Sequence, residues 1–263
     1  MNNVLPLQKG IIYGPVNSKR LGHSLGINLF PTTRKVCTFD CSYCHYGGTK
    51  EKTLAPKRED LPTIEQVTSA VEEALKSNLE FDYLTFSGNG EPMVHPDFRE
   101  IVRRIKALKD RYRPHVPLTL LSNSSCLAKS VDIDTLSLID NRIFKLDCAD
   151  EETYKAMNDA VPGIMVKDII TGLETVSSVL PITIQTVFID GPVKNFEGEV
   201  FEKWLEAIKR IKPLRIQAYS TDRPVAQTGV TMISDEQLIA LANMIQEKTN
   251  IPTRAYPAQK NRR

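Results

Sequence analysis

The sequence predicts an α/β fold: a partial (β/α)6 barrel whose curved parallel sheet carries helices on its outside, all in a single domain. Six strand-like runs recur along the 263 residues. Each run is followed by a helical pattern or by a connection that contains one. Because the helices occur singly between strands and not in separate groups, one curved sheet is favoured over two separate domains.

The strand-like runs are short and end at turn-forming or polar residues. In the first run, apolar and polar side chains alternate, so that Leu25, Ile27 and Leu29 share one face. A glycine-rich break directly after Ser87 ends the second run. The six strands are expected at residues 24–30, 82–87, 117–122, 142–147, 182–189 and 214–219.

Helical patterns occupy the intervals between these strands. Thr63 and Gln66 form a capping-box pair, which predicts that a helix begins there and buries an apolar stripe reaching Leu75. Apolar residues at helical spacing predict a second helix over residues 96–112. Further helices are expected at residues 132–139, 151–157, 166–179, 197–211 and 235–248.

The composition is that of a globular protein. With 41% apolar and 25% charged residues, the chain belongs to neither the disordered nor the fibrous class. Nucleic acid stays open as a partner, but the net charge of +2 does not support it, and the basic residues near 96–113 are interpreted as a solvated helix face. No apolar run approaches a bilayer span, and residues 1–9 do not resemble a signal peptide. We therefore expect a cytoplasmic protein without a membrane partner.

Three of the five cysteines fall within eight residues, directly after the first predicted strand. Cys37, Cys41 and Cys44 have the spacing C-x3-C-x2-C, and on a loop three thiolates so spaced can turn toward one centre. A disulfide would leave one cysteine over. Zinc would need a fourth ligand, which His45 could supply. An iron–sulfur cluster with three cysteine ligands would leave one iron open.

Polar residues and glycines also follow the next three predicted strands. In parallel α/β sheets the carboxyl ends of the strands meet at one edge, where functional groups gather. We therefore expect the cysteine loop to share one site with these residues. They are Gly88, Asn89, Gly90 and Glu91 after the second strand, Ser122, Asn123 and Ser124 after the third, and Lys145 and Asp147 at the end of the fourth.

The cysteine motif resembles the signature of the radical S-adenosylmethionine (SAM) superfamily, with Tyr43 in its aromatic position. Residues 87–92 are similar to the superfamily's Gly-Gly-Glu-Pro segment, apart from Asn89 inserted between the glycines. Residues 14–28 resemble a branch of uncharacterised iron–sulfur oxidoreductases related to wyosine-base synthases. The matching motifs span residues 14–223, and the cysteine spacing is the most specific of them.

The resemblance implies one radical SAM domain over residues 1–263, with a core at about 20–250 and a flexible basic tail at 257–263. Cys37, Cys41 and Cys44 would each ligate one iron of a 4Fe-4S cluster, and SAM would chelate the fourth iron. An electron from a donor such as flavodoxin or ferredoxin would cleave SAM to methionine and a 5′-deoxyadenosyl radical. That radical would abstract hydrogen from an unidentified small-molecule, peptide or nucleotide substrate.

The resemblance also implies contacts to SAM. Gly88 and Gly90 would let the backbone approach the methionine moiety, and Glu91 would pair with its ammonium. Lys145 would pair with the methionine carboxylate or remain in an ion pair with Asp147. Other expected cofactor-binding residues are Tyr43, Asn89, Ser122, Asn123, Ser124, Asp147, Gln185 and Tyr219. Each of these segments, taken alone, also fits an ordinary turn or cap.

Three further residues have two interpretations each. Cys126 and Cys148 lie just past the third and fourth strands, where a thiol could donate a hydrogen atom in catalysis or simply be buried as a small apolar residue. Arg223 could contact an anionic substrate or be an ordinary loop residue. A tRNA-base-modifying enzyme and an activase for a glycyl radical enzyme stay open within the same class. Outside it, the alternative is a zinc-stabilised binding module that uses His45.

Overall fold

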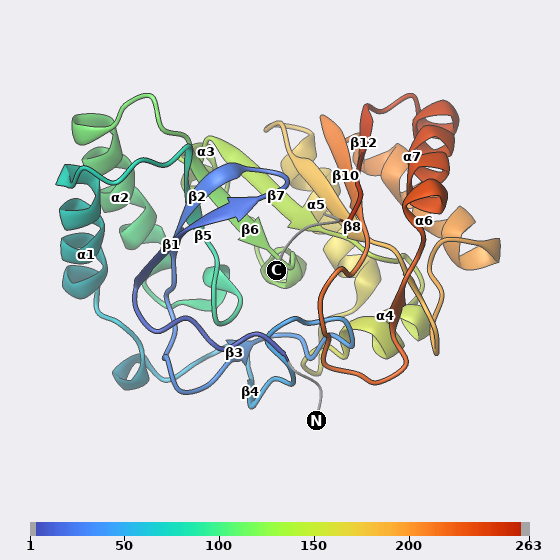
Figure 1. Ribbon diagram of the computed structural model, residues 1–263, viewed down its shortest axis with the longest axis horizontal. Coiled ribbons are helices and arrows are strands. Elements are labelled where there is room, and N and C mark those ends of the chain that lie inside the picture. Colours follow the sequence, from blue (N-terminus) through green and yellow to red (C-terminus); the bar gives the residue numbers. More distant parts are fainter. Residues whose placement is uncertain (1–3, 259–263) are drawn as a thin grey trace.

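The chain folds around one curled sheet of eight strands in the computed structural model, which describes residues 4–258 (Figure 1). Seven of the strands run parallel, and β1 at one edge runs antiparallel to β2. In spatial order the sheet consists of β1 (Ile12–Ser18), β2 (Gly22–Ile27), β5 (Tyr83–Phe86), β6 (Leu118–Ser122), β7 (Asn141–Lys145), β8 (Thr183–Val187), β10 (Arg215–Tyr219) and β12 (Thr253–Tyr256). The predicted partial barrel with a parallel sheet is confirmed.

The six predicted strands correspond to β2, β5, β6, β7, β8 and β10. The edge strands β1 and β12 were not predicted. Two small sheets of two strands each were also missed among the described residues. One pairs β3 (Val36–Cys37) with β4 (Glu51–Lys52), and the other pairs β9 (Ile189–Asp190) with β11 (Thr231–Met232).

Helices cover the outside of the curled sheet (Figure 1). The capping box of Thr63 and Gln66 is present at the start of α1, and Ser234 and Gln237 form a second one that opens α7. The helix expected at 132–139 is present but shorter than expected, since α3 comprises five residues, Ile133–Ser137. The helices are α1 (Ile64–Lys76), α2 (Phe98–Tyr112), α3 (Ile133–Ser137), α4 (Glu151–Asn158), α5 (Val166–Ser177), α6 (Gly198–Ile211) and α7 (Asp235–Thr249), with 3-10 turns η1 (Arg58–Asp60), η2 (Pro92–Val94) and η3 (Ser125–Ala128).

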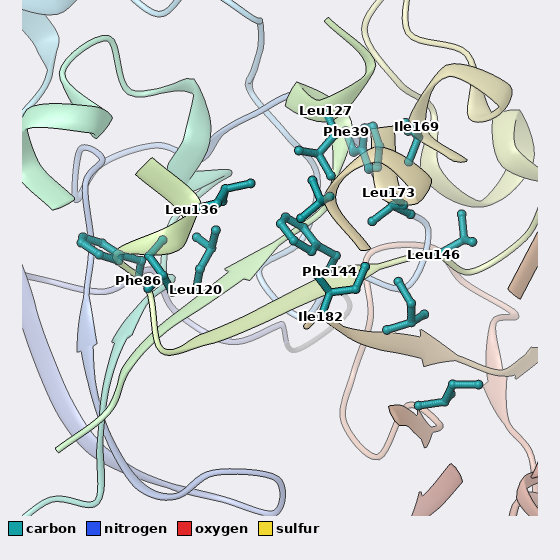
Figure 2. Close-up of a cluster of buried hydrophobic side chains, with 14 of the residues drawn as sticks. Phe39, Phe86, Leu120, Leu127, Leu136, Phe144, Leu146, Ile169, Leu173 and Ile182 are labelled. Carbon is teal, nitrogen blue, oxygen red and sulfur yellow. The ribbon is translucent and has the colours of Figure 1, made fainter. Parts of the chain in front are cut away.

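The two faces of the sheet differ in polarity, because successive side chains of a strand point to opposite sides. On the outer face, Phe86, Leu120 and Phe144 are buried in the core beneath the helices (Figure 2). The inner face is mixed: it carries Thr85 and Gln185 but also Leu121 and Ile143. It lines a cavity of about 470 Å³, so the alternation along the strands separates the lining of this cavity from the buried core.

The turn between β1 and β2 reaches the loop that follows β10 (Figure 1). Lys19 Nζ lies 2.5 Å from Asp222 Oδ2 and donates to the carbonyl of Pro257 at 2.8 Å. The guanidinium of Arg20 lies 4.4 Å from the centroid of the Tyr219 ring. These contacts join the β1–β2 side of the open sheet to the β10–β12 side, so they close the inner cavity laterally.

Within residues 4–258, no helix has both the length and the apolar character needed to cross a bilayer. The tail that was expected to be flexible comprises residues 257–263, of which 259–263 lie outside the described residues. The two described residues of this tail are hydrogen-bonded: the Pro257 carbonyl accepts from Lys19, and the backbone N–H of Ala258 donates to Asp235 Oδ1 at 2.9 Å.

Candidate functional site

The cysteine loop is anchored on the segment that follows β5. Backbone hydrogen bonds join the two: Val36 N donates to the Asn89 carbonyl at 2.9 Å, and Glu91 N donates to the Val36 carbonyl at 3.3 Å. These bonds fix the position of Cys37, the first cysteine of the loop, relative to the end of β5. Cys44 N donates to the carbonyl of Cys41 at 3.1 Å, which forms a tight turn between the last two cysteines. All five cysteines of the chain are free thiols.

Each of the three sulfurs in this loop has an N–H donor of its own. Lys35 Nζ lies 3.0 Å from Cys44 Sγ. Asn123 Nδ2 lies 3.5 Å from Cys37 Sγ, and Asn158 Nδ2 lies 3.6 Å from Cys41 Sγ. Donors of this kind stabilise negative charge on sulfur, as metal-bound thiolates require.

Burial opposes the ionisation of two of the three thiols, Cys37 and Cys41, in the absence of metal. Burial raises the pKa of Cys37 to about 12 and that of Cys41 to about 11. Burial also opposes the charge of Lys35, but its three cysteine neighbours, Cys44 first, raise its pKa overall. One cation is therefore close to all three sulfurs. Metal binding would deprotonate the thiols, and the resulting thiolates fit this cationic environment.

The geometry does not favour a single zinc ion. Among residues 4–258, no three His, Cys, Asp or Glu side chains come close enough together to share one metal ion. His45 Nδ1 lies 3.3 Å from the carbonyl of Pro224, so this nitrogen has a backbone partner. A zinc ion requires all four ligands around one centre, whereas a 4Fe-4S cluster takes each cysteine at a different iron and tolerates wider spacing.

Two cavities adjoin at this end of the barrel. The larger, about 470 Å³, is lined by Cys37, the glycines after β5 and the inner face of the sheet. The smaller, about 320 Å³, is lined by Tyr43, Cys44, His45 and the loop after β10. The residues that line both are Val16, Ser18, Arg20, Tyr46 and Arg223. The cysteine loop thus lies between two spaces that together could hold a cofactor and a substrate.

Seven of the predicted cofactor-binding residues line the larger cavity, and two line the smaller one. In the larger cavity are Gly88, Gly90, Glu91, Ser122, Asn123, Lys145 and Gln185. In the smaller cavity are Tyr43 and Tyr219. The expected gathering of strand ends is therefore present at one edge of the sheet.

The packing of the protein's own atoms requires glycine at positions 88 and 90. A Cβ on Gly90 would lie 1.6 Å from the Val36 carbonyl oxygen, and a Cβ on Gly88, at φ +120°, would lie 2.8 Å from Asn28 Oδ1. The inserted Asn89 is fully buried, and its side chain bonds Gln8 and Pro31. This segment therefore holds the cysteine loop and the N-terminal arm in place.

Glu91 connects the ends of β5 and β6. Its carboxylate accepts hydrogen bonds from Ser122 Oγ at 2.9 Å, from Asn123 N at 2.6 Å and from Met93 N at 3.0 Å. Both oxygens therefore have partners within the protein, and the expected pairing with the methionine ammonium stays a prediction. The bond to Asn123 helps to orient the side chain that donates to Cys37.

Glu91 is expected to make the stability of the metal-free protein depend on pH. Burial raises its pKa from 4.5 to about 7, although the three hydrogen bonds lower it. The folded state therefore holds this proton more tightly than the unfolded state, and its contribution is full below pH 4.5 and lost as the pH rises toward 7. The free energy of unfolding should fall by roughly 3 kcal/mol over that window.

Urea denaturation of the wild type and of Glu91→Gln, each at pH 4.5 and pH 7.5, measures this contribution. The wild type should lose more stability than the variant as the pH rises, because the amide does not titrate in this range. Equal pH dependence in the two proteins would contradict the prediction.

An ion pair joins Lys145, the last residue of β7, to Asp147 two residues later. Lys145 Nζ lies 3.0 Å from Asp147 Oδ1 and 2.8 Å from the Tyr219 hydroxyl. Burial opposes the charge of Lys145, but Asp147 and then Tyr219 raise its pKa. Asp147 also accepts from the Tyr43 hydroxyl, which fixes the aromatic residue of the cysteine loop. Of the two roles expected for Lys145, the ion pair is present.

Some predicted residues lie away from both cavities. Asn89 and Asp147 bond other parts of the protein, as described above, and Ser124 Oγ donates to the Lys145 carbonyl at 2.8 Å. Cys126 faces a separate outer pocket beside His95, and Cys148 is buried against Phe39 and Tyr154. The position of Cys148 fits its interpretation as a buried apolar residue, and Cys126, which is partly buried, lies outside both cavities.

Sequence reasoning did not single out Lys35, Asn158 or Arg20 as site residues. Lys35 stands two positions before Cys37, and that proximity was the one available signal. Asn158 is the last residue of α4, 117 positions from the cysteine it contacts, and only the folded chain brings the two together.

Comparisons with known proteins agree with this geometry. Residues 33–242 match the family model of the radical SAM superfamily. The chain is 27% identical over 284 residues to the UPF0026 protein of Synechocystis sp., covering 98% of this chain and 99% of that protein. It is 28% identical over 247 residues to the UPF0026 protein of Methanocaldococcus jannaschii, covering 92% and 74%. A protein named GTPase Obg from Brachyspira hyodysenteriae is 28% identical over 228 residues, covering 86% of this chain, which spans about a third (32%) of that protein.

Solved structures share the fold at low sequence identity. A radical SAM methyltransferase from Sphaerobacter thermophilus superposes with a TM-score of 0.62 at 14% identity, covering 90% of this chain and 67% of that one. TYW1 with a lysine-pyruvate adduct superposes with a TM-score of 0.58 at 16% identity, covering 87% and 75%. Because the family model covers most of the chain, including the cysteine loop and the strands from β5 to β10, the chain belongs to the radical SAM superfamily of enzymes, which use a 4Fe-4S cluster and S-adenosylmethionine.

Proposed function

We propose that this enzyme uses a 4Fe-4S cluster, held by Cys37, Cys41 and Cys44, to cleave SAM reductively and start radical chemistry on a substrate in the barrel cavity. The observation that carries the proposal is the set of three cysteine sulfurs, each with an N–H donor, in a loop whose Cys37 lines that cavity and whose Cys44 lines the adjoining one. Bound there, the cluster and SAM would supply a 5′-deoxyadenosyl radical that abstracts hydrogen.

The chain's own residues would position and enclose these reactants. Gly88 and Gly90 keep the wall of the larger cavity free of side chains beside the cysteine loop. Asn123, oriented by Glu91, holds the sulfur of Cys37. Lys145 offers a buried cation at the cavity wall, and the aligned Gln185 and Gln217 of β8 and β10 are joined at 2.9 Å. A dry, walled interior protects a reactive radical from side reactions.

The proposal is tested by anaerobic reconstitution with iron and sulfide. The protein should become brown, contain about four irons per chain and give the electron paramagnetic resonance signal of a reduced 4Fe-4S cluster with dithionite. With SAM added, 5′-deoxyadenosine and methionine should form. A colourless protein that binds one zinc and makes no 5′-deoxyadenosine would exclude the proposal.

In the cell, a small donor such as flavodoxin or ferredoxin would supply the electron. Such donors and five free thiols fit a reducing compartment, and we propose that the protein is located in the cytoplasm. The substrate remains a small molecule, peptide or nucleotide within this proposal.

Lys35 should tune the reduction potential of the cluster. Its ammonium is 3.0 Å from Cys44 Sγ, so it stabilises the more negative, reduced state. Replacing it in Lys35→Met should lower the midpoint potential by roughly 100 mV, since a unit charge a few ångströms away is worth about 2–3 kcal/mol at an effective dielectric constant near 20. A redox titration monitored by electron paramagnetic resonance measures the shift.

The matched control is Lys50→Met, which removes an exposed lysine of the same loop region. Its potential should stay at the wild-type value. Equal shifts in the two variants would mean that the general loss of positive charge, and not the contact to Cys44, sets the potential.

A further inference from the structure

We propose that Arg20 and Arg223 bind an anionic group of the substrate, a phosphate or a carboxylate, at the junction of the two cavities. This inference rests on the proposed function and specifies the substrate class of the same site. Both side chains line the larger and the smaller cavity. They come from opposite sides of the open sheet, Arg20 from the turn between β1 and β2 and Arg223 from the loop after β10.

The charges at this junction are not balanced. Lys19 is paired with Asp222 at 2.5 Å. Arg223 Nε is 3.9 Å from the same carboxylate, at the limit of an ion pair, and Arg20 has no carboxylate within 4.0 Å among residues 4–258. Three cations and one anion, Asp222, therefore line this junction, which leaves a net charge of +2 beside the cavities. A walled site concentrates such a field and attracts anions.

Arg20 is also held in a suitable orientation. Its guanidinium lies over the Tyr219 ring, 4.4 Å from the centroid, which fixes the guanidinium and leaves N–H groups at its edge free to donate. A planar guanidinium can bind two oxygens of a phosphate or carboxylate at once. Arg223 is about one-third exposed, so its side chain can complete the contact from the other side of the opening.

The carboxylate of SAM is the alternative source of an anion, and the positions argue against it. Gly88, Gly90, Ser122 and Asn123, the expected SAM contacts after β5 and β6, line only the larger cavity. The two arginines lie across the barrel opening from these four residues, although Tyr219, another expected cofactor contact, is the ring on which Arg20 stacks. We assign the anion to a second molecule that enters beside the cofactor, and the measured affinity for SAM separates the two sources.

The test uses the reconstituted enzyme and three probes: inorganic phosphate, pyrophosphate and malonate. Calorimetric titration should show saturable binding of at least one probe to the wild type. Arg20→Gln and Arg223→Gln should each weaken that binding about tenfold or more, because a charged bidentate contact is lost. Comparison of pyrophosphate with malonate distinguishes a phosphate from a carboxylate site. The affinity for SAM, measured in parallel, should change less than about threefold.

The matched control is Arg111→Gln, which removes an arginine that also lies near a tyrosine ring but is on α2, outside both cavities. It should bind the probes like the wild type. Arg20→Lys keeps the charge without the planar fork and should retain intermediate binding, and thermal unfolding midpoints verify that each variant is folded.

Three results would overturn the inference. If no probe binds the wild type, or if Arg111→Gln weakens binding as much as the cavity variants, there is no anion site at this junction. If the cavity variants weaken SAM binding about tenfold, the arginines serve the cofactor. Failure of the proposed function would be distinct, because it would show as absence of iron, of SAM binding and of 5′-deoxyadenosine while the arginine-dependent binding of probes persisted.

Discussion

Replacing any one of Cys37, Cys41 or Cys44 by alanine is expected to reduce the iron content from about four per chain to below one and to abolish 5′-deoxyadenosine formation. Each thiolate would hold a different iron, so none can take over the role of another. The remaining N–H donors would then face a site without its full set of sulfur ligands. Iron and sulfide analysis after anaerobic reconstitution measures the loss directly, without dependence on a substrate.

Two variants serve as controls for the cysteine series. His45→Ala should keep the cluster, because its Nδ1 has a backbone partner in Pro224. Cys126→Ala should also keep it, because that thiol faces a separate pocket. Loss of metal from His45→Ala would instead support a zinc site with histidine as fourth ligand, and loss of iron from Cys126→Ala would contradict the assignment of the three ligands.

Gly90→Ala is expected to destabilise the metal-free protein by about 3 kcal/mol or more and to impair cluster assembly. The new Cβ would lie 1.6 Å from the Val36 carbonyl oxygen and 2.7 Å from its carbon, both backbone atoms that cannot rotate away. The chain would have to separate from Val36, and Cys37 would move with it. Urea denaturation measures the first effect, and iron content after reconstitution measures the second.

Gly48→Ala is the matched control, since Gly48 follows the same cysteine loop. There a Cβ would meet nothing closer than Asp40 Oδ1 at 3.8 Å, which is ordinary contact. Its free energy of unfolding should stay within about 0.5 kcal/mol of the wild type. A stable Gly90→Ala protein with full iron content would show that the loop is not anchored on Val36.

The strands that could be predicted from the sequence are those with a buried, regular pattern. Leu84 and Phe86 face the core and Thr85 faces the cavity, so β5 shows an alternation that follows from its environment. The edge strands lack this signal. β1 contains Gly14 and Pro15 and has an irregular register between Tyr13 and Val16, so it has the composition of a turn. β12 is four residues long and only partly buried.

The residues of the candidate site likewise fall into those that the sequence shows and those that only the folded chain brings together. The spacing of the three cysteines and the polar residues at strand ends are local features, and the sequence shows them directly. Asn158 and Arg20 are different, because each contacts a partner more than a hundred positions away. The hydrogen bonds of Glu91 could not be predicted for a related reason: its three donors are brought to it by η2 and by the end of β6.

The turn at residues 18–22 is joined to the far side of the barrel opening by side-chain contacts and not by strand pairing. It is held by the mostly buried ion pair of Lys19 with Asp222, a bond to the Pro257 carbonyl and the stacking of Arg20 on Tyr219. Contacts of this kind are worth about 1 kcal/mol each, and salt weakens the ionic one. Contacts this weak are expected to break far more often than the sheet unfolds, and added salt should weaken the attachment of this turn before it affects any strand.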